Sequence, residues 1–114
     1  MHELGIVFHV IKRLEDLATE QNLKQIQSVT LEIGEVSGVV GEYLTDCWKW
    51  AIKKTTILKD AALNIEMIPA VTICNMCGKT YATVEHGKKC PHCQSEDTVL
   101  QSGNEMSIKQ IEAC

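Results

Sequence analysis

The sequence predicts an α+β fold in which two helices pack on a three-stranded mixed sheet, with an inserted zinc-ribbon-like domain that carries four cysteines. Two segments have apolar residues at helical spacing, and three others alternate apolar with polar residues. Two Cys-x-x-Cys pairs lie together in one stretch that is poor in large apolar residues. With 114 residues, of which 45% are hydrophobic and 23% charged, the chain suits one compact core and a small module.

The two helices are predicted from apolar residues that recur every three or four positions. The first runs from Leu4 to about Asn22, and the second runs from about Gly41 to Lys54. The apolar stripe of the first comprises Leu4, Val7, Phe8, Ile11, Leu14, Leu17 and Ala18, and that of the second Leu44, Cys47, Trp48, Ala51 and Ile52. We expect Trp50 to lie to one side of the second stripe, and Cys47 to be a small buried hydrophobic residue.

The three strands are predicted from a period of two. Their alternating apolar residues are Val29, Leu31 and Ile33 in the first, Leu63, Ile65 and Met67 in the second, and Met106 and Ile108 in the third. Glycines from Gly34 to Gly38 end the first strand, and Pro69 ends the second. The third follows a turn at 102–104, and we expect it to rejoin the main sheet.

Residues 71–104 are predicted to be a separate insert between the second and third strands. About 34 residues are too few for an apolar core, so the insert needs another source of stability, such as a bound metal. The sequence therefore divides into an α+β domain, residues 1–70 plus 105–114, and a metal-binding domain, residues 71–104.

Cys74, Cys77, Cys90 and Cys93 are the predicted zinc ligands. Each Cys-x-x-Cys pair places two thiolates on one tight turn, and two turns complete a tetrahedron. Four thiolates leave no position for a substrate, so the zinc would be structural. Gly78 suits a turn residue with positive φ, and Pro91 suits the second turn.

Other chemistries use similar cysteines. A pair of redox dithiols would need one pair at the start of a helix, which the sequence does not indicate. A rubredoxin-type iron centre uses the same four ligands, and metal analysis distinguishes it. His86 and His92 lie close enough in sequence to replace a cysteine, although solvated loop histidines are the simpler interpretation. Cys114 is terminal and is not expected to take part.

Composition argues against several function classes. The formal net charge of −4 gives no long-range attraction to nucleic acid or to an anionic membrane. No stretch approaches the ~20 apolar residues that cross a bilayer, and no signal peptide is visible, so we expect a cytoplasmic protein. No nucleophile, general base and orienting group form a recognisable set, so we expect no enzyme.

The first three residues, Met1-His2-Glu3, form a potential nickel site. The amine of Met1 and the deprotonated amide nitrogen of His2 close a five-membered chelate ring, and the imidazole of His2 closes a six-membered ring. A fourth donor would come from the amide or the carboxylate of Glu3. Nickel(II) and copper(II) favour such a square-planar set of nitrogen donors, whereas zinc(II) favours a tetrahedral one.

The order of these features resembles the HypA/HybF family of hydrogenase-maturation nickel metallochaperones. The resemblance runs from end to end and rests on four segments, Met1-His2-Glu3-Leu4, Leu31-Glu32-Ile33-Gly34 with Glu35-Val36-Ser37 after it, the doubled Cys-x-x-Cys, and Gly103-Asn104-Glu105-Met106. This chain departs from many relatives at two positions. It has Gln94 where a glycine often follows the second Cys-x-x-Cys pair, and it has the extra Cys114. Neither is a ligand.

The resemblance implies a nickel carrier. Met1, His2 and Glu3 would bind the transported Ni(II), and Cys74, Cys77, Cys90 and Cys93 the structural Zn(II). A nickel-loading maturation GTPase and the large subunit of [NiFe]-hydrogenase would be partners, with a urease accessory protein in some organisms. The chain would be a monomer or a weak homodimer.

The alternative function is a zinc-ribbon module that binds nucleic acid or another protein. Lys79, Lys88 and Lys89 favour it, whereas Glu85, Glu96 and Asp97 offset their charge within the insert. Aromatic residues for base stacking are also scarce there beyond Tyr81.

Overall fold

The computed structural model describes residues 3–114, so Met1 and His2 lie outside the described residues. The described chain forms two compact units. We call residues 3–32, 39–66 and 107–114 the α+β unit, and residues 33–38 and 67–106 the knuckle unit. No helix among the described residues has the length and apolar character to span a membrane.

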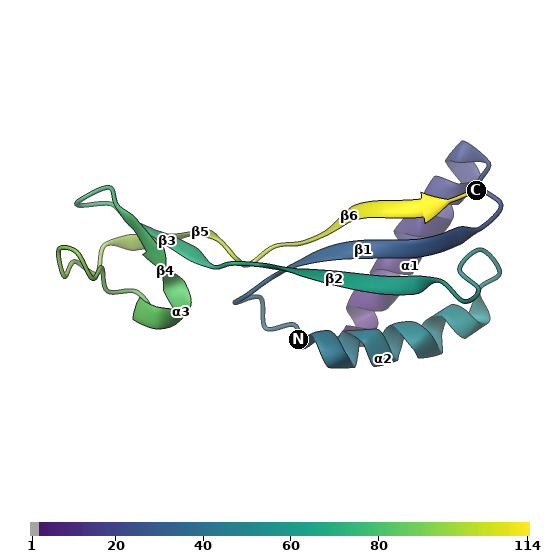
Figure 1. The fold of residues 1–114 in the computed structure, drawn as a ribbon, viewed down its shortest axis with the longest axis horizontal. Coiled ribbons are helices and arrows are strands. Elements are labelled where there is room, and N and C mark those ends of the chain that lie inside the picture. Colours follow the sequence, from purple (N-terminus) through teal and green to yellow (C-terminus); the bar gives the residue numbers. More distant parts are fainter. Residues whose placement is uncertain (1–2) are drawn as a thin grey trace. The chain divides into compact units, whose positions relative to one another are not determined.

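The elements follow the order expected from the sequence (Figure 1). They are α1 (Glu3–Gln21), β1 (Ile26–Gly34), α2 (Gly41–Ala51), the 3-10 turn η1 (Ile52–Lys54), β2 (Ala62–Ile68), β3 (Val71–Cys74), β4 (Thr80–Ala82), α3 (Thr83–His86), β5 (Thr98–Ser102) and β6 (Met106–Ala113). One sheet has the order β2-β1-β6, with α2 connecting β1 to β2. The predicted fold class, two helices on a three-stranded mixed sheet plus a four-cysteine insert, is confirmed.

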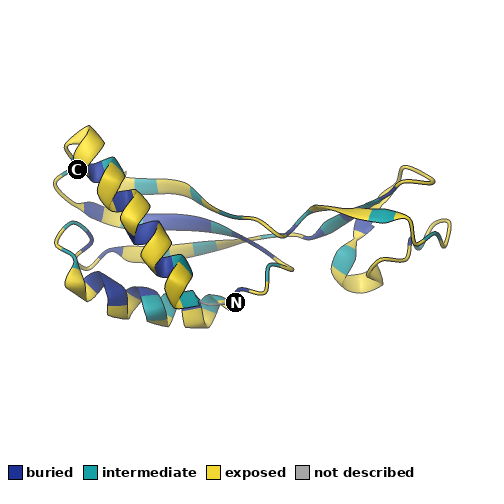
Figure 2. Ribbon diagram, turned by 180° about the vertical axis from the view of Figure 1, so that it is seen from behind, coloured by how far each residue is buried: buried dark blue, intermediate teal, exposed yellow. Residues whose placement is uncertain are grey.

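The α+β unit has an apolar core between its helices and its sheet. Helices α1 and α2 pack against each other, and Figure 2 shows buried residues along the length of α1. Fully buried side chains in this unit include Val7, Val10, Leu14, Ile26, Val29, Leu31, Leu44, Trp48 and Leu58. The buried Trp48 side chain has its hydrogen-bond donor satisfied, because its Nε1 donates to the Ala61 carbonyl at 3.0 Å. Hydrophobic burial therefore stabilises this unit.

Two residues of the predicted α1 stripe are exposed, and a third, Leu17, is half-buried. Leu4 is 39% exposed and Phe8 is 47% exposed. At roughly 100° per residue, Phe8 projects well away from the line formed by Val7 and Leu14, and it lies on the flank of the buried face. Cys47 of α2 is half-buried rather than fully buried. Trp50, expected off the stripe, is 47% exposed.

The knuckle unit contains a second, antiparallel sheet of order β4-β3-β5. Central β3 pairs with β4 in the register Thr72↔Tyr81 and with β5 in the register Thr72↔Leu100. A register irregularity separates the pairs of Val71 and Thr72 with β5. The one-turn helix α3 follows β4 directly.

Three chain segments of the knuckle unit meet with almost no space between their backbones. A Cβ on Gly34 would overlap the Gly103 carbonyl, and a Cβ on Gly103, whose φ is +106°, would overlap Ala70. Two carboxylates bind backbone amides here: Glu35 Oε1 accepts from Ala70 N at 2.8 Å, and Glu105 Oε1 accepts from Gly103 N at 2.6 Å. This packing accounts for the Gly34-Glu35 and Gly103-Asn104-Glu105 segments as structural features.

Candidate metal sites

The four predicted cysteine ligands come together in the knuckle unit. The Sγ atoms of Cys74, Cys77, Cys90 and Cys93 all lie within 4.8 Å of one another. The Cys74–Cys93 sulfur distance is 3.5 Å, and the Cys77–Cys90 distance is 3.7 Å. A tetrahedral zinc ion with bonds of about 2.3 Å requires sulfurs about 3.8 Å apart. The donor set therefore fits a four-coordinate zinc ion in both chemistry and spacing.

The two Cys-x-x-Cys turns have the same backbone hydrogen bonds. In each, the residue after the second cysteine donates to the carbonyl of the first, and the first cysteine donates to the carbonyl five residues on. The four bonds are Gly78 N to Cys74 O, Cys74 N to Lys79 O, Gln94 N to Cys90 O and Cys90 N to Ser95 O, at 2.9, 3.0, 2.9 and 2.9 Å. The residue after the second cysteine has positive φ, +75° at Gly78 and +67° at Gln94. The expectation for Gly78 is confirmed, and Gln94 adopts the same conformation with a side chain.

The thiols of the cluster differ in acidity. Hydrogen bonding from the backbone N–H of Cys77 lowers the pKa of Cys74 to about 7, against the opposing effect of its burial. Hydrogen bonding from the Ser95 backbone lowers the pKa of Cys93, but the contact of its thiol with Cys74 and partial desolvation of the thiol outweigh that effect and raise the pKa to about 12. Proton loss from one sulfur thus disfavours loss from its neighbour, and a bound cation removes this conflict.

The side chains around the cluster form a very small core. Buried Tyr81 packs with Cys74 and Cys90, and its hydroxyl donates to the Gly87 carbonyl at 2.9 Å. The ring of His86 lies edge-on to Tyr81, with ring centroids 5.8 Å apart, and its Nε2 is 3.7 Å from Glu85. Among the described residues, no imidazole belongs to the metal-competent cluster. The simpler interpretation of His86, a histidine outside the metal shell, agrees with this placement.

The proposed nickel-binding end is described only from Glu3 onward. Glu3 begins α1, and its Oε2 accepts a hydrogen bond from the backbone N–H of Val40 at 3.1 Å. Val40 is the residue before α2. The structure thus ties the start of α1 to the start of α2 through the one predicted nickel ligand that it describes. Sequence reasoning did not anticipate this contact, since nothing in the pattern brings residues 37 positions apart together.

Comparisons with known proteins agree with this architecture. The model of the family described as "HypA: Hydrogenase/urease nickel incorporation, metallochaperone, hypA" matches residues 1–113. Hydrogenase maturation factors HypA of Dehalococcoides mccartyi and Geobacter metallireducens are 35% and 34% identical over 112 residues, which is 98% of this chain and 93% and 98% of theirs. The solution structure of the Ni metallochaperone HypA from Helicobacter pylori has a TM-score of 0.75 at 24% identity, covering 99% of this chain and 97% of that one, and shares the fold.

Proposed function

Because the chain belongs to the HypA family of metallochaperones for nickel incorporation into hydrogenase and urease, we propose that it binds Ni(II) at Met1, His2 and Glu3 and Zn(II) at Cys74, Cys77, Cys90 and Cys93. Family membership makes the chain a metal carrier and not an enzyme. The observation that carries the proposal is the separation of donor types: the four thiols are clustered with one another, and the nitrogen donors belong to the chain's first three residues.

The zinc site is proposed as structural. Four thiolates fill a tetrahedral shell and leave no position for exchange or transfer. Zinc also supplies the stability that the small core around Tyr81 lacks. On this proposal, residues 71–104 act as the zinc-binding domain, and residues 1–70 plus 105–114 act as the nickel-binding domain.

The nickel site is proposed to be planar and weak. The Met1 amine, the His2 amide nitrogen and the His2 imidazole supply three donors, and exchangeable coordination at a chain end allows nickel to move to a deeper acceptor site. We assign the fourth position to the amide nitrogen of Glu3. The Glu3 carboxylate instead holds the helix start to Val40.

The partners follow from the family's role. We propose that the chain works in the cytoplasm with a nickel-loading maturation GTPase and delivers nickel to the large subunit of [NiFe]-hydrogenase. A urease accessory protein would be a further partner where urease is present.

Nickel titration of the untagged chain tests the proposed site. Replacing His2 with Ala removes the imidazole donor, and acetylating the amine of Met1 removes the amine donor, so each change should weaken nickel binding at least tenfold. Equal nickel affinity in all three proteins would exclude the N-terminal site.

A second pair of variants tests the role of Glu3. Glu3→Gln keeps an oxygen that accepts from Val40, whereas Glu3→Ala removes it. If the carboxylate positions the helix start, Glu3→Gln should bind nickel as the parent chain does and Glu3→Ala more weakly. An equal loss in both variants would make the carboxylate itself a ligand.

A further inference from the structure

Most of the aromatic side chains in this chain are on the surface of the two main helices. The sequence has two Trp, two Tyr and one Phe. Trp48 and Tyr81 are buried, but Phe8 on α1 is 47% exposed, and Tyr43 and Trp50 on α2 are 60% and 47% exposed. Aromatic residues exposed together, in a chain with so few of them, indicate a surface that another molecule covers.

These residues form one continuous surface in the α+β unit. Phe8 and Trp50 contact each other edge to face, with ring centroids 6.3 Å apart and an interplanar angle of 63°. Tyr43, Cys47 and Trp50 recur at helical spacing on one face of α2, and Leu4 lies one turn before Phe8 on α1. We call Leu4, Phe8, Tyr43, Cys47 and Trp50 the aromatic stripe.

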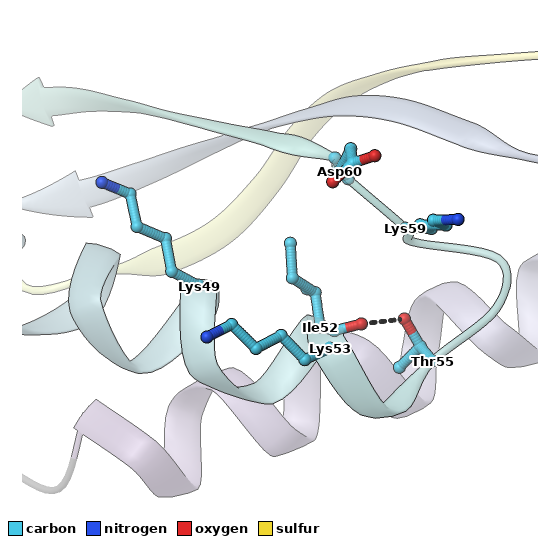
Figure 3. Close-up of a pocket in the computed structure, with 7 residues that line it drawn as sticks. Lys49, Ile52, Lys53, Thr55, Lys59 and Asp60 are labelled. Atoms are coloured by element: carbon cyan, nitrogen blue, oxygen red, sulfur yellow. Dashed lines mark hydrogen bonds between the residues drawn. The ribbon is translucent and has the colours of Figure 1, made fainter.

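One end of the aromatic stripe is basic, although the chain has a net charge of −4. Lys54 Nζ lies 4.2 Å from the centroid of the Trp50 ring. Lys49, Lys53 and Lys59, together with the single acidic residue Asp60, line a cavity of about 490 Å³ beside the end of α2 (Figure 3). Within residues 3–114, none of these four lysines forms an ion pair with a carboxylate. The surface therefore offers exposed aromatic area next to unpaired positive charge.

The other end of the aromatic stripe adjoins the chain's beginning. Leu4 follows Glu3 directly, and the Glu3 carboxylate binds the amide of Val40, itself 44% exposed and three residues before Tyr43. A protein that covers the stripe would therefore contact the chain close to its first residues. That position suits a protein that exchanges metal with them.

We propose that the aromatic stripe docks an amphipathic segment of the partner GTPase. Its apolar side chains would cover Phe8, Tyr43 and Trp50, and its carboxylates would meet Lys53 and Lys54. An apolar segment with acidic residues at one end complements both the aromatic area and the unpaired lysines. The choice of partner rests on the proposed function, but the surface does not depend on which atoms bind nickel.

The test is the affinity of the purified GTPase for variants of the full-length, zinc-loaded chain, measured by calorimetry. The double variant Phe8→Ala, Trp50→Ala should bind at least tenfold more weakly, because exposed aromatic anchors dominate such interfaces. Lys54→Glu should bind severalfold more weakly, with less dependence on salt. Val99→Ala is the matched control, since Val99 is 53% exposed on β5 of the knuckle unit, and it should bind as the parent chain does.

Three results would overturn the proposal. The double variant could bind as tightly as the parent chain, or Val99→Ala could weaken binding equally. Sedimentation could also show that the parent chain self-associates and that only the double variant does not, which would assign the stripe to a second copy of this chain.

Circular dichroism and nickel titration of the same variants separate the two proposals. The docking proposal expects native folding and unchanged nickel affinity in the double variant. If His2→Ala leaves nickel affinity unchanged while the double variant loses the GTPase, the nickel site is wrong and the docking surface stands.

Discussion

The α+β unit and the knuckle unit are stabilised by different physical means. The α+β unit buries large aliphatic and aromatic side chains, among them Leu14, Leu44 and Trp48, at 1% exposure or less. In the knuckle unit, the buried cluster around the cysteines comprises Cys74, Tyr81 and Cys90. Burial of apolar surface stabilises the first unit. The second has close backbone packing and, on our proposal, a metal ion bound by its four cysteines. One chain thus combines a unit that has a large apolar core with a unit whose stability, on our proposal, depends on its metal.

Removing the metal should give the largest difference in stability between the two units. Chelation, or Cys90→Ser, should cost the knuckle unit its ordered structure, because its core is too small without the metal. The amide signals of α1 and β1 should persist in two-dimensional NMR, while those of 71–102 should collapse to random-coil positions. A metal-free chain that keeps native signals for 71–102 would show that zinc is dispensable to the fold.

A core substitution in the α+β unit should destabilise that unit and leave the knuckle unit unaffected. Leu44 is fully buried on α2, and Leu44→Ala should lower the free energy of unfolding of this unit by about 2–5 kcal/mol through lost burial and a residual cavity. Zinc affinity, measured by competition with a chelator, should stay unchanged. A parallel loss of zinc affinity would mean that the two units fold as one.

Adding a side chain to a closely packed glycine should have an effect of intermediate size on the free energy of unfolding. A methyl group at Gly34 would overlap the Gly103 carbonyl, so Gly34→Ala should destabilise by about 1–3 kcal/mol or more. Gly41→Ala is the matched control, because its Cβ would meet only Ile65 Cδ1, at 3.6 Å. Alanine in that helix should be neutral or stabilising by up to about 1 kcal/mol. Thermal unfolding of both variants measures the difference, and equal melting temperatures would contradict this account.

The smallest expected effect compares the two cysteine turns. Gln94 has a φ of +67° at the position equivalent to Gly78, so Gln94→Gly should relieve backbone strain of about 1 kcal/mol. Gly78→Ala should introduce strain of similar size, since open space surrounds the site and only its φ of +75° disfavours a side chain. Zinc retention against a chelator should rise in the first variant and fall in the second. A rise in both would mean that strain does not limit zinc binding.

Much of this organisation follows from local patterns, and the rest depends on tertiary contacts. Periodicity was enough to place α1, α2, β1, β2 and β6, and spacing was enough to bring the four cysteines together. Periodicity assigned Leu4 and Phe8 to the core. The spacing of apolar residues along a helix does not show how much of that helix the neighbouring elements cover. The strands β3 and β5 have only four and five residues, so their alternation is too short to predict a strand. The contact between Glu3 and Val40, and the overlap of Gly34 with Gly103, join residues far apart in sequence and leave no local signal.

The central claim is that one chain keeps zinc and nickel in different donor sets. X-ray absorption at both metal edges, on one untagged sample loaded with zinc and one equivalent of nickel, tests it directly. We predict a zinc shell of four sulfurs at about 2.3 Å and a planar nickel shell of nitrogen and oxygen atoms. Sulfur in the nickel shell, or nitrogen replacing sulfur around zinc, would contradict the division between Met1-His2-Glu3 and the four cysteines.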